Sequence, residues 1–334
     1  MIVKKLIQLC LLLPLIMVMS PIYAKTIKIA TISPDGTLWM NEMRAGAKEI
    51  KEKTQGRVIL KFYPGGVMGS DENVLRKIHI GQLQGGAVTT GSLTGAYPDI
   101  DIYSLPYLFS SLEQVSYVRE KMDQFLLDEL EKNGFVSFGF GEGGFTYMMS
   151  DSSLYTVEDV RKQKVWIPGG NKVGEAVFSS ADISPVTLPL SDVLTGLQTG
   201  LVDTVITSPI GAIALQWHTR VKYVIDVPLT YVAAMLVIDK KAFSKIKKED
   251  QSIVREVMTS AFKRIDAANR RDNQAAQQAL KQQGIEYISL PKASLDAWHV
   301  IGEKAINKLK QDNSYAPAIY NKLMGYVNAA KKNK

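Results

Sequence analysis

The order of strand-like and helix-like segments constrains the fold of this 334-residue chain more than any other feature. A helical pattern of apolar residues begins at Trp39, and Ser70 and Gly81 bound a second helix. These helices alternate with three short apolar runs that are typical of buried strands: residues 26–32, 58–63 and 86–89. We therefore expect a β-α-β-α-β unit, whose parallel strands need helices over the sheet.

A second α/β set follows a long predicted helix at 112–132 and two apolar runs at 135–140 and 145–149. Thr156 and Asp159 form a capping box, and Pro209 occupies a first helical position. The remaining predicted strands end near Trp166 and span 186–188, 201–207 and 231–238, while helices cover 171–180, 192–199 with Ser191 as the cap, 248–283, and 293 to the end. Two α/β lobes bridged by C-terminal helices are expected.

The N-terminal segment predicts export. Lys4 and Lys5 precede an apolar run at 6–19, which is shorter than the roughly 20 residues that a membrane span needs. We expect a signal peptide at 1–24, a mature chain beginning at Lys25, and a location in the Gram-negative periplasm. Cys10, the only cysteine, lies inside this segment. The mature chain is thus expected to have no disulfide and no cysteine metal site.

Composition fits a globular binding protein better than a nucleic-acid-binding protein. The chain is 46% hydrophobic and 22% charged, and the remaining 310 residues suffice for two domains of about 150 residues. The formal charge of +7 falls to +5 without Lys4 and Lys5. Basic residues are interleaved with acidic ones and form no face with stacking aromatic residues, so no nucleic-acid partner is expected.

Signals for an enzyme or a cofactor are weak. Residues 139–144 match the G-x-G-x-x-G dinucleotide fingerprint, but a strand rather than a helix follows them. A pyrophosphate would therefore lack the helix N-terminus that binds it. His79, His218 and His299 are isolated and form no metal-ligand spacing. We expect no catalytic residues, no metal, no cofactor, and a protein that is not an enzyme.

Seven short motifs follow one another along the chain and cover nearly the whole mature chain. They are Glu-Lys-Thr-Gln-Gly-Arg-Val at 52–58, Tyr-Pro-Gly-Gly-Val-Met-Gly-Ser-Asp at 63–71, Ile-Gly-Gln-Leu at 80–83, Leu-Pro-Tyr-Leu-Phe at 105–109, Glu-Asp at 158–159, Lys-Val-Trp-Ile-Pro at 164–168, and Gly-Leu-Gln-Thr-Gly-Leu-Val-Asp at 196–203. Each motif alone is weak, whereas their order and spacing are specific. Together they resemble the DctP-type solute-binding proteins of tripartite ATP-independent periplasmic (TRAP) transporters.

The resemblance implies a monomeric periplasmic protein with a two-lobed, type II-like solute-binding fold, each lobe having a mixed sheet flanked by helices. Lobe I is expected at 25–144 plus 233–272, and lobe II at 145–232 plus 273–334. The protein would capture a small organic solute between the lobes and deliver it to the small and large subunits of a TRAP permease, driven by an ion gradient. A ligand-sensing module for a membrane receptor is the alternative from another class.

The family's usual solute is an organic acid that an arginine clamps, and the resemblance places Trp166 at that arginine's position. Thr146 matches a second basic position, and Thr207 lies near an asparagine position of the family. The other expected ligand-binding residues are Thr89 and Asp71, at matched polar and acidic positions, and the aromatic residues Trp217, Trp39 and Tyr147. Trp298 is assigned to the core.

Three interpretations of the solute stay open. A neutral, apolar or aromatic molecule would stack on Trp166, with Phe178 as a further wall. A cation would lie over the same ring, with Asp71 or Glu142 as the counter-charge. The alternative for Glu142 is a solvated side chain on the segment that crosses between the lobes. An organic acid would need helix N-termini or a relocated basic residue: Ser70, Asn171, Ser208 or Lys172. The first is favoured, because an unpaired buried charge costs roughly 3–5 kcal/mol.

Overall fold

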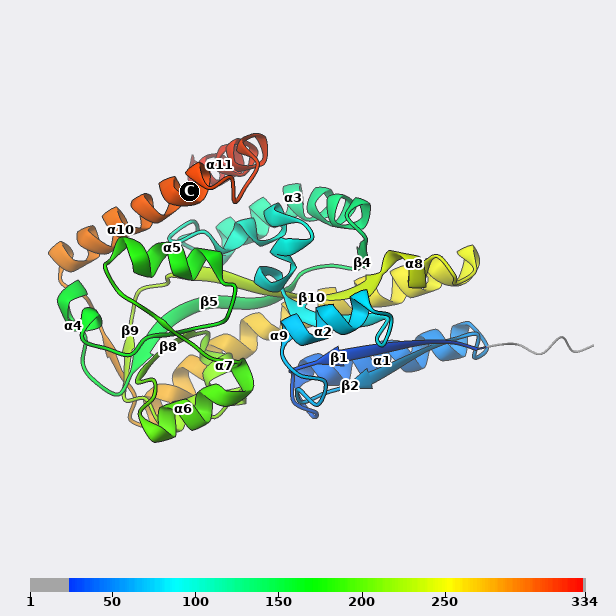
Figure 1. Ribbon diagram of the computed structural model, residues 1–334, viewed down its shortest axis with the longest axis horizontal. Helices are drawn as coiled ribbons and strands as arrows, with labels where there is room; N and C mark the ends of the chain where they lie inside the picture. The colour runs from blue at the N-terminus through cyan, green and yellow to red at the C-terminus, as the bar shows by residue number, and fades with distance from the viewer. Residues whose placement is uncertain (1–23, 333–334) are drawn as a thin grey trace, which may run out of the picture.

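Two α/β arrangements joined by shared strands make up residues 24–332, the part of the chain that the computed structural model describes (Figure 1). The first arrangement begins β1 (Lys25–Thr31), α1 (Leu38–Lys53), β2 (Val58–Tyr63), α2 (Asp71–His79) and β3 (Gly85–Thr89). β1 pairs in parallel with both β2 and β3. The side chains of Thr37 and Ser70 accept hydrogen bonds from the first turns of α1 and α2. The predicted β-α-β-α-β unit is confirmed.

Two long antiparallel strands, β5 (Gly141–Ser150) and β10 (Thr230–Asp239), connect the two lobes (Figure 1). β10 pairs with β3 in the first lobe, whereas the far end of β5 pairs in the second with β8 (Thr204–Thr207) and β9 (Tyr223–Ile225). With β11 (Glu286–Ile288) at one edge, the strand order within the described residues is β11-β9-β5-β10-β3-β1-β2. The G-x-G-x-x-G residues lead into β5, as expected, and no helix follows them. Before them come the 3-10 helices η1 (Thr90–Gly95) and η2 (Pro98–Ser104), α3 (Leu112–Lys132) and β4 (Phe135–Ser137).

The second lobe repeats short strands and helices. Thr156 and Asp159 form the predicted capping box. Ser191 does not cap the following helix, a prediction that was wrong, because residues 190–192 form a 3-10 turn and Asp192 is the N-cap residue. The elements are α4 (Val157–Arg161), β6 (Trp166–Ile167), α5 (Lys172–Ser180), β7 (Val186–Thr187), η3 (Leu190–Asp192), α6 (Val193–Thr199), β8 (Thr204–Thr207), α7 (Pro209–Ala214), η4 (Trp217–Thr219) and β9 (Tyr223–Ile225).

The C-terminal elements cover both lobes. After α8 (Lys240–Phe243), the 35-residue helix α9 (Lys248–Gln282) runs along the molecule and packs on α1 at one end and α7 at the other (Figure 1). β11 (Glu286–Ile288) follows, α10 (Lys292–Gln311) packs on α5, and α11 (Pro317–Lys332) packs on α3. The C-terminal segment therefore contacts both α/β arrangements. The division of the chain into lobes at the stated boundaries stays a prediction.

Apolar side chains of the described residues form clusters on both sides of the shared strands. One cluster under α1 and α9 includes Ile29 and Phe262 of the first lobe. The second lobe has its own clusters, one of which contains Trp166. The cluster under α3 includes Val118 of the first lobe together with Val173 of α5, so apolar packing also continues from one lobe to the other.

The predicted signal peptide and Cys10 lie outside the described residues. Within residues 24–332, no helix is both long enough and apolar enough to cross a bilayer.

Candidate functional site

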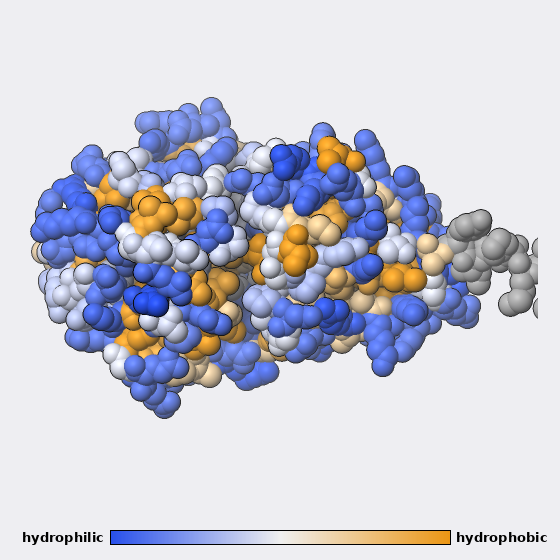
Figure 2. All heavy atoms as spheres, turned by 60° about the horizontal axis from the view of Figure 1, so that its bottom comes forward, coloured by the Kyte–Doolittle hydropathy of each residue, from blue (hydrophilic) through white to orange (hydrophobic). Residues whose placement is uncertain are grey.

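A cavity of about 230 Å³ lies between the two lobes. Its walls come from η1 and η2 in the first lobe, from β6, α5, β8 and η4 in the second, and from the shared strands β5 and β10. In Figure 2 a furrow separates the two halves of the molecule, with hydrophobic residues gathered along its sides. This volume is below the range of about 300–1,000 Å³ that is typical of pockets for drug-sized ligands, so the cavity suits a smaller organic molecule.

Trp166 and Trp217 form an aromatic corner of this cavity. Trp166 follows Val165 onto the two-residue strand β6, which pairs in parallel with β7. Only 2% of Trp166 is exposed, and its Nε1 donates to the Leu188 carbonyl oxygen at 3.0 Å. The two indole rings meet edge to face, with centroids 5.0 Å apart. Because its donor is already satisfied, Trp166 offers a ligand apolar and π surface rather than a hydrogen bond.

Hydroxyl groups supply most of the polar surface of the cavity. Thr146 on β5 and Thr230 on β10 share a hydrogen bond of 2.8 Å between their Oγ1 atoms. Thr207 ends β8, next to the N-cap residue Ser208 of α7. On the first lobe, Thr89 and Thr90 close β3 and begin η1. Such groups both donate and accept hydrogen bonds, so they can orient a neutral ligand without imposing a charge.

No lysine or arginine is among the described residues that line the cavity, and its one carboxylate belongs to Asp101. Asp101 Oδ1 accepts hydrogen bonds from Thr90 Oγ1 at 2.6 Å and from Ser104 Oγ at 2.7 Å. Burial raises the pKa of Asp101 to about 6. Lys172, the expected relocated cation, is exposed and does not line the cavity.

A second carboxylate, Asp71, lies directly behind this wall. Its Oδ2 accepts hydrogen bonds from the Thr89 amide and hydroxyl, each at 2.9 Å, and from Ser92 Oγ at 3.0 Å. Its Oδ1 is buried and has no hydrogen-bond partner in the described structure. Burial raises the pKa of Asp71 as well. Asp71 therefore positions two hydroxyl-bearing residues of the cavity wall and does not itself line it.

Five of the eight predicted ligand-binding residues line the cavity: Trp166, Trp217, Thr89, Thr146 and Thr207. Trp39 does not, because its ring packs edge to face on Phe262, with centroids 5.4 Å apart, in the core of the first lobe. Tyr147 packs against the apolar cluster behind Trp166. Whether any of these residues contacts a solute stays a prediction.

Other residues reach the cavity without having been predicted there. Trp298 packs in the core, as expected, but it also lines the cavity. Tyr107 lies in the Leu-Pro-Tyr-Leu-Phe motif and has a positive φ of 54°. The centroid of its ring lies 4.6 Å from that of the His299 ring. The motif was the one sequence signal at Tyr107, because its positive φ is visible only in the structure. Asp101 carried no signal in the sequence, because its partner Thr90 lies 11 positions away and becomes its neighbour only in the folded chain.

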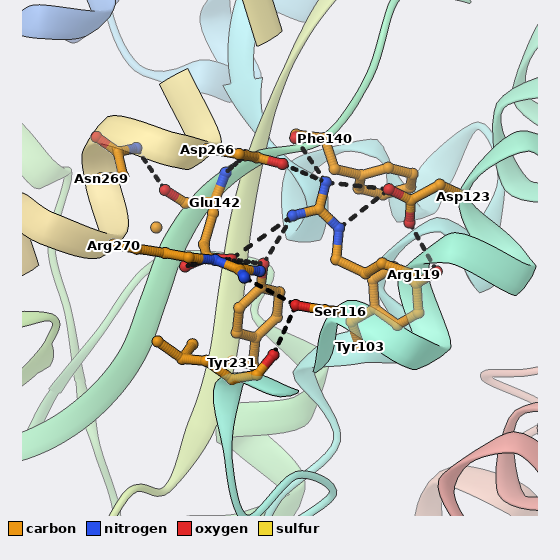
Figure 3. A network of polar contacts seen from close by, with 12 residues as sticks. Tyr103, Ser116, Arg119, Asp123, Phe140, Glu142, Tyr231, Asp266, Asn269 and Arg270 are labelled. Atoms are coloured by element: carbon orange, nitrogen blue, oxygen red, sulfur yellow. Dashed lines mark hydrogen bonds and ion pairs between the residues drawn. The ribbon is translucent and has the colours of Figure 1, made fainter. Parts of the chain in front are cut away.

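A buried ion network lies where the shared strands meet α9 (Figure 3). Glu142 on β5 is 1% exposed and accepts hydrogen bonds from Arg270 Nη2 at 2.8 Å and from the Tyr231 hydroxyl at 3.2 Å. Arg119 on α3 lies 3.8 Å from Glu142 and pairs with Asp266 at 2.9 Å. The interpretation of Glu142 as a solvated residue was wrong, because β5 turns this side chain towards α9. Glu142 is therefore not available as a counter-charge for a ligand.

Two glycines of the fingerprint-like segment, Gly139 and Gly144, allow close contact with α9. Gly144 has a φ of 90°, and a Cβ there would lie 2.8 Å from Asn273 Nδ2. Asn273 donates to the Gly143 carbonyl oxygen and accepts from the Ile210 amide of α7. This side chain thereby links the shared strand to the second lobe. In the described part of the chain, no group of three or more histidine, cysteine, aspartate or glutamate residues could hold a metal ion.

Comparison with known proteins places this geometry among bacterial solute-binding proteins. A family model described as bacterial extracellular solute-binding protein, family 7 (DctP), matches residues 29–312. The C4-dicarboxylate-binding periplasmic protein DctP of Rhodobacter capsulatus is 24% identical over 261 residues, which cover 76% of this chain and 77% of that protein.

Solved structures share the fold at low sequence identity. A TRAP periplasmic solute binding protein from Pseudomonas putida F1 with bound D-glucuronate has a TM-score of 0.81 and 21% identity, covering 91% of this chain and 97% of that one. DctP7, a Bordetella pertussis extracytoplasmic solute receptor binding pyroglutamic acid, has a TM-score of 0.82 and 20% identity, covering 91% and 100%. The two-lobed α/β fold predicted from the sequence is thereby confirmed.

Proposed function

Because this chain belongs to the DctP family, the family 7 bacterial extracellular solute-binding proteins, we propose that it captures a small neutral, apolar or aromatic solute for a TRAP transporter. It would act in the periplasm and pass the solute to the small and large permease subunits. The observation that carries the choice of solute is the cavity itself, which combines an aromatic corner at Trp166 and Trp217 with no lysine or arginine among its described lining residues.

The magnitude of the missing charge favours a solute without a carboxylate. A hydrogen bond to a charged partner is worth roughly 1.5–3 kcal/mol, and a buried unpaired charge costs roughly 3–5 kcal/mol. A carboxylate placed here would make no hydrogen bond to a cation and would incur part of the cost of an unpaired buried charge, and Asp101 would repel it. A neutral molecule would instead stack on Trp166 and hydrogen-bond to the threonines.

Closure of the lobes is the physical step that binding would drive. The cavity wall comes from both lobes, so a solute touches all of it only in the closed form. Contacts made only in that form shift an open–closed equilibrium by their differential free energy. A permease or a membrane receptor could then recognise the closed protein. Genes for small and large membrane subunits beside this one would favour the permease over the receptor.

An organic acid remains the second candidate, because one observation favours it. Asn171, the N-cap residue of α5, and Gly174 in its first turn both line the cavity, so the positive end of this helix faces the cavity. The R. capsulatus, P. putida and B. pertussis relatives carry names or titles that mention C4-dicarboxylate, D-glucuronate and pyroglutamic acid. Acids of these classes therefore belong in the test.

A thermal-shift screen separates the two candidates. A ligand at one hundred times its dissociation constant stabilises the protein by about 2.7 kcal/mol. We expect shifts from neutral aromatic or apolar compounds and none from succinate, D-glucuronate or sialic acid. Quenching of tryptophan fluorescence by the bound solute should weaken in Trp166→Phe and persist in the control Trp39→Phe, whose ring does not line the cavity. A strong shift with an acid that Trp166→Phe leaves unchanged would refute the proposal.

A further inference from the structure

Asp101 is the one charged residue among the described residues that line the cavity, and half of its carboxyl group is unused. The residue lies on η2 and is 5% exposed. Both hydroxyl donors, from Thr90 and Ser104, are bound to Oδ1. No partner for Oδ2 is found in the described part of the chain, and Oδ2 is not among the fully buried side-chain atoms that lack a partner, so a small polar group can reach it.

The path from the cavity to Oδ2 is open because the neighbouring residue is a glycine. Gly91 also lines the cavity, and a Cβ added to it would have Asp101 Oδ2 as its nearest atom, at 3.7 Å. Apart from its chain neighbours Thr90 and Ser92, no described residue lies closer to that position than Asp101. The side chain that is missing at Gly91 would stand beside this oxygen, so its absence leaves room for a ligand group to approach.

The charges around Asp101 do not compensate it. Asp71 lies behind Thr89 and Ser92 on the same wall and is also an acid. The other titratable groups close by are Asp99, on the same 3-10 helix, and Tyr315, whose pKa is raised by burial and by both aspartates. A donor from the solute would therefore meet a negative potential without a competing protein cation.

We propose that Asp101 determines specificity by accepting, at Oδ2, a hydrogen bond from an N–H or O–H group of the solute, whose apolar body lies against Trp166. This inference rests on the proposed function and narrows it, because the solute then has a hydrogen-bond donor at one end. A charge-assisted bond of this kind is worth about 1.5–3 kcal/mol, which corresponds to roughly 10- to 150-fold in affinity.

Probes that differ only in the donor test the proposal by isothermal titration calorimetry. Benzyl alcohol has an O–H donor, and benzyl methyl ether has the same ring without one. We expect the alcohol to bind roughly tenfold or more tightly than the ether. Benzylamine and N,N,N-trimethylbenzylammonium form the matching pair of probes with a charged group. Tighter binding of benzylamine would show that Asp101 accepts a hydrogen bond from an N–H donor.

Variants locate the effect at Asp101. Asp101→Asn should reduce the preference for the donor probes by about tenfold, whereas Asp99→Asn should leave it unchanged. Asp99 is an equally buried acid on the same 3-10 helix that binds the Ala316 amide and does not line the cavity. Gly91→Ala is a second variant, which keeps the carboxylate but places a methyl group beside Oδ2, and it should also weaken the donor preference.

The outcomes separate this inference from the function on which it rests. Equal binding of donor and non-donor probes by the wild type, or full retention of the preference in both Asp101→Asn and Gly91→Ala, would overturn the role of Asp101 while leaving solute capture intact. Failure of all four probes to bind at millimolar concentration would refute the proposed cavity chemistry as a whole, and this inference with it.

Discussion

Replacing Glu142 by glutamine should destabilise the protein where its two lobes are joined. The glutamine keeps the size of the side chain but removes the negative charge that Arg270 and the Tyr231 hydroxyl contact. Arg270 would then lose its carboxylate partner in a region where Glu142 itself is 1% exposed. Arg119 would be affected less, because it keeps its contacts with Asp123 and Asp266.

The expected loss follows from the burial of the two partners. Removing one partner of a buried ion pair costs about 3–5 kcal/mol. The Arg270 side chain is 34% exposed and can recover part of its hydration, so the lower end, about 3 kcal/mol, applies. Unfolding entropy of roughly 2.1 cal/mol/K per residue over the whole chain then converts this loss into a decrease in Tm of about 4 °C.

Differential scanning calorimetry at neutral pH measures this decrease, with Glu131→Gln as the matched control. Glu131 also pairs with an arginine, Arg255, at 2.9 Å, but both side chains are more than one third exposed. Surface pairs contribute about 0–1 kcal/mol and weaken in salt. The Glu142 effect should exceed the control several-fold and persist at high salt. Equal decreases for the two variants would refute the claim that burial makes this pair important.

Three further outcomes follow from the packing and charge of the described residues. Gly85→Ala should lower the free energy of unfolding by about 1–3 kcal/mol in urea, because its Cβ would lie 2.6 Å from the Val237 carbonyl oxygen; an unchanged midpoint would contradict this. A double-mutant cycle of Trp166→Leu and Trp217→Leu, measured the same way, should give a coupling of about 0.5–1.5 kcal/mol, and additivity would show that the edge-to-face pair is unimportant. The pKa of Asp101 is about 6 in the folded protein and 3.8 ordinarily, so the folded state binds the Asp101 proton more tightly than the unfolded state. As pH falls from about 6 to 4, the wild type should therefore gain stability relative to Asp101→Asn, by about 1.4 kcal/mol per pH unit. Parallel profiles of stability against pH for the two proteins would contradict this.

Local signals in the sequence sufficed for most of the helices and strands. The capping box at Thr156, the cap at Ser70 and the proline at position 209 all begin helices where expected, since these interactions involve residues a few positions apart. The strand expected at 201–207 begins only at Thr204. Leu201 and Val202 are apolar, but they come before the residues that pair with β5, and Leu201 is half exposed. The apolar run in the sequence is therefore longer than the strand.

A motif and a strand end together gave the clearest signal for a cavity residue, whereas Thr146 and Trp217 were predicted from the family resemblance alone. Trp166 met both conditions and lines the cavity, whereas Trp39 is an equally large ring that met neither and packs on Phe262. Asp101 and its hydroxyl partners come together because η1 and η2 fold against β10. Such contacts depend on tertiary packing, which periodicity and capping patterns do not describe.

The ion pairs of the arginines explain why cations lie at the shared strands but none lines the neighbouring cavity in the described part of the chain. Arg119 and Arg270 reach the shared strands from α3 and α9, but Glu142, Asp123 and Asp266 occupy their guanidinium groups. Recruiting either one to a ligand would break a buried pair, at a cost of about 3–5 kcal/mol. That cost exceeds the gain of about 1.5–3 kcal/mol from one charged hydrogen bond. The network at the lobe junction therefore keeps these cations away from the cavity, which leaves Asp101 to set its polarity.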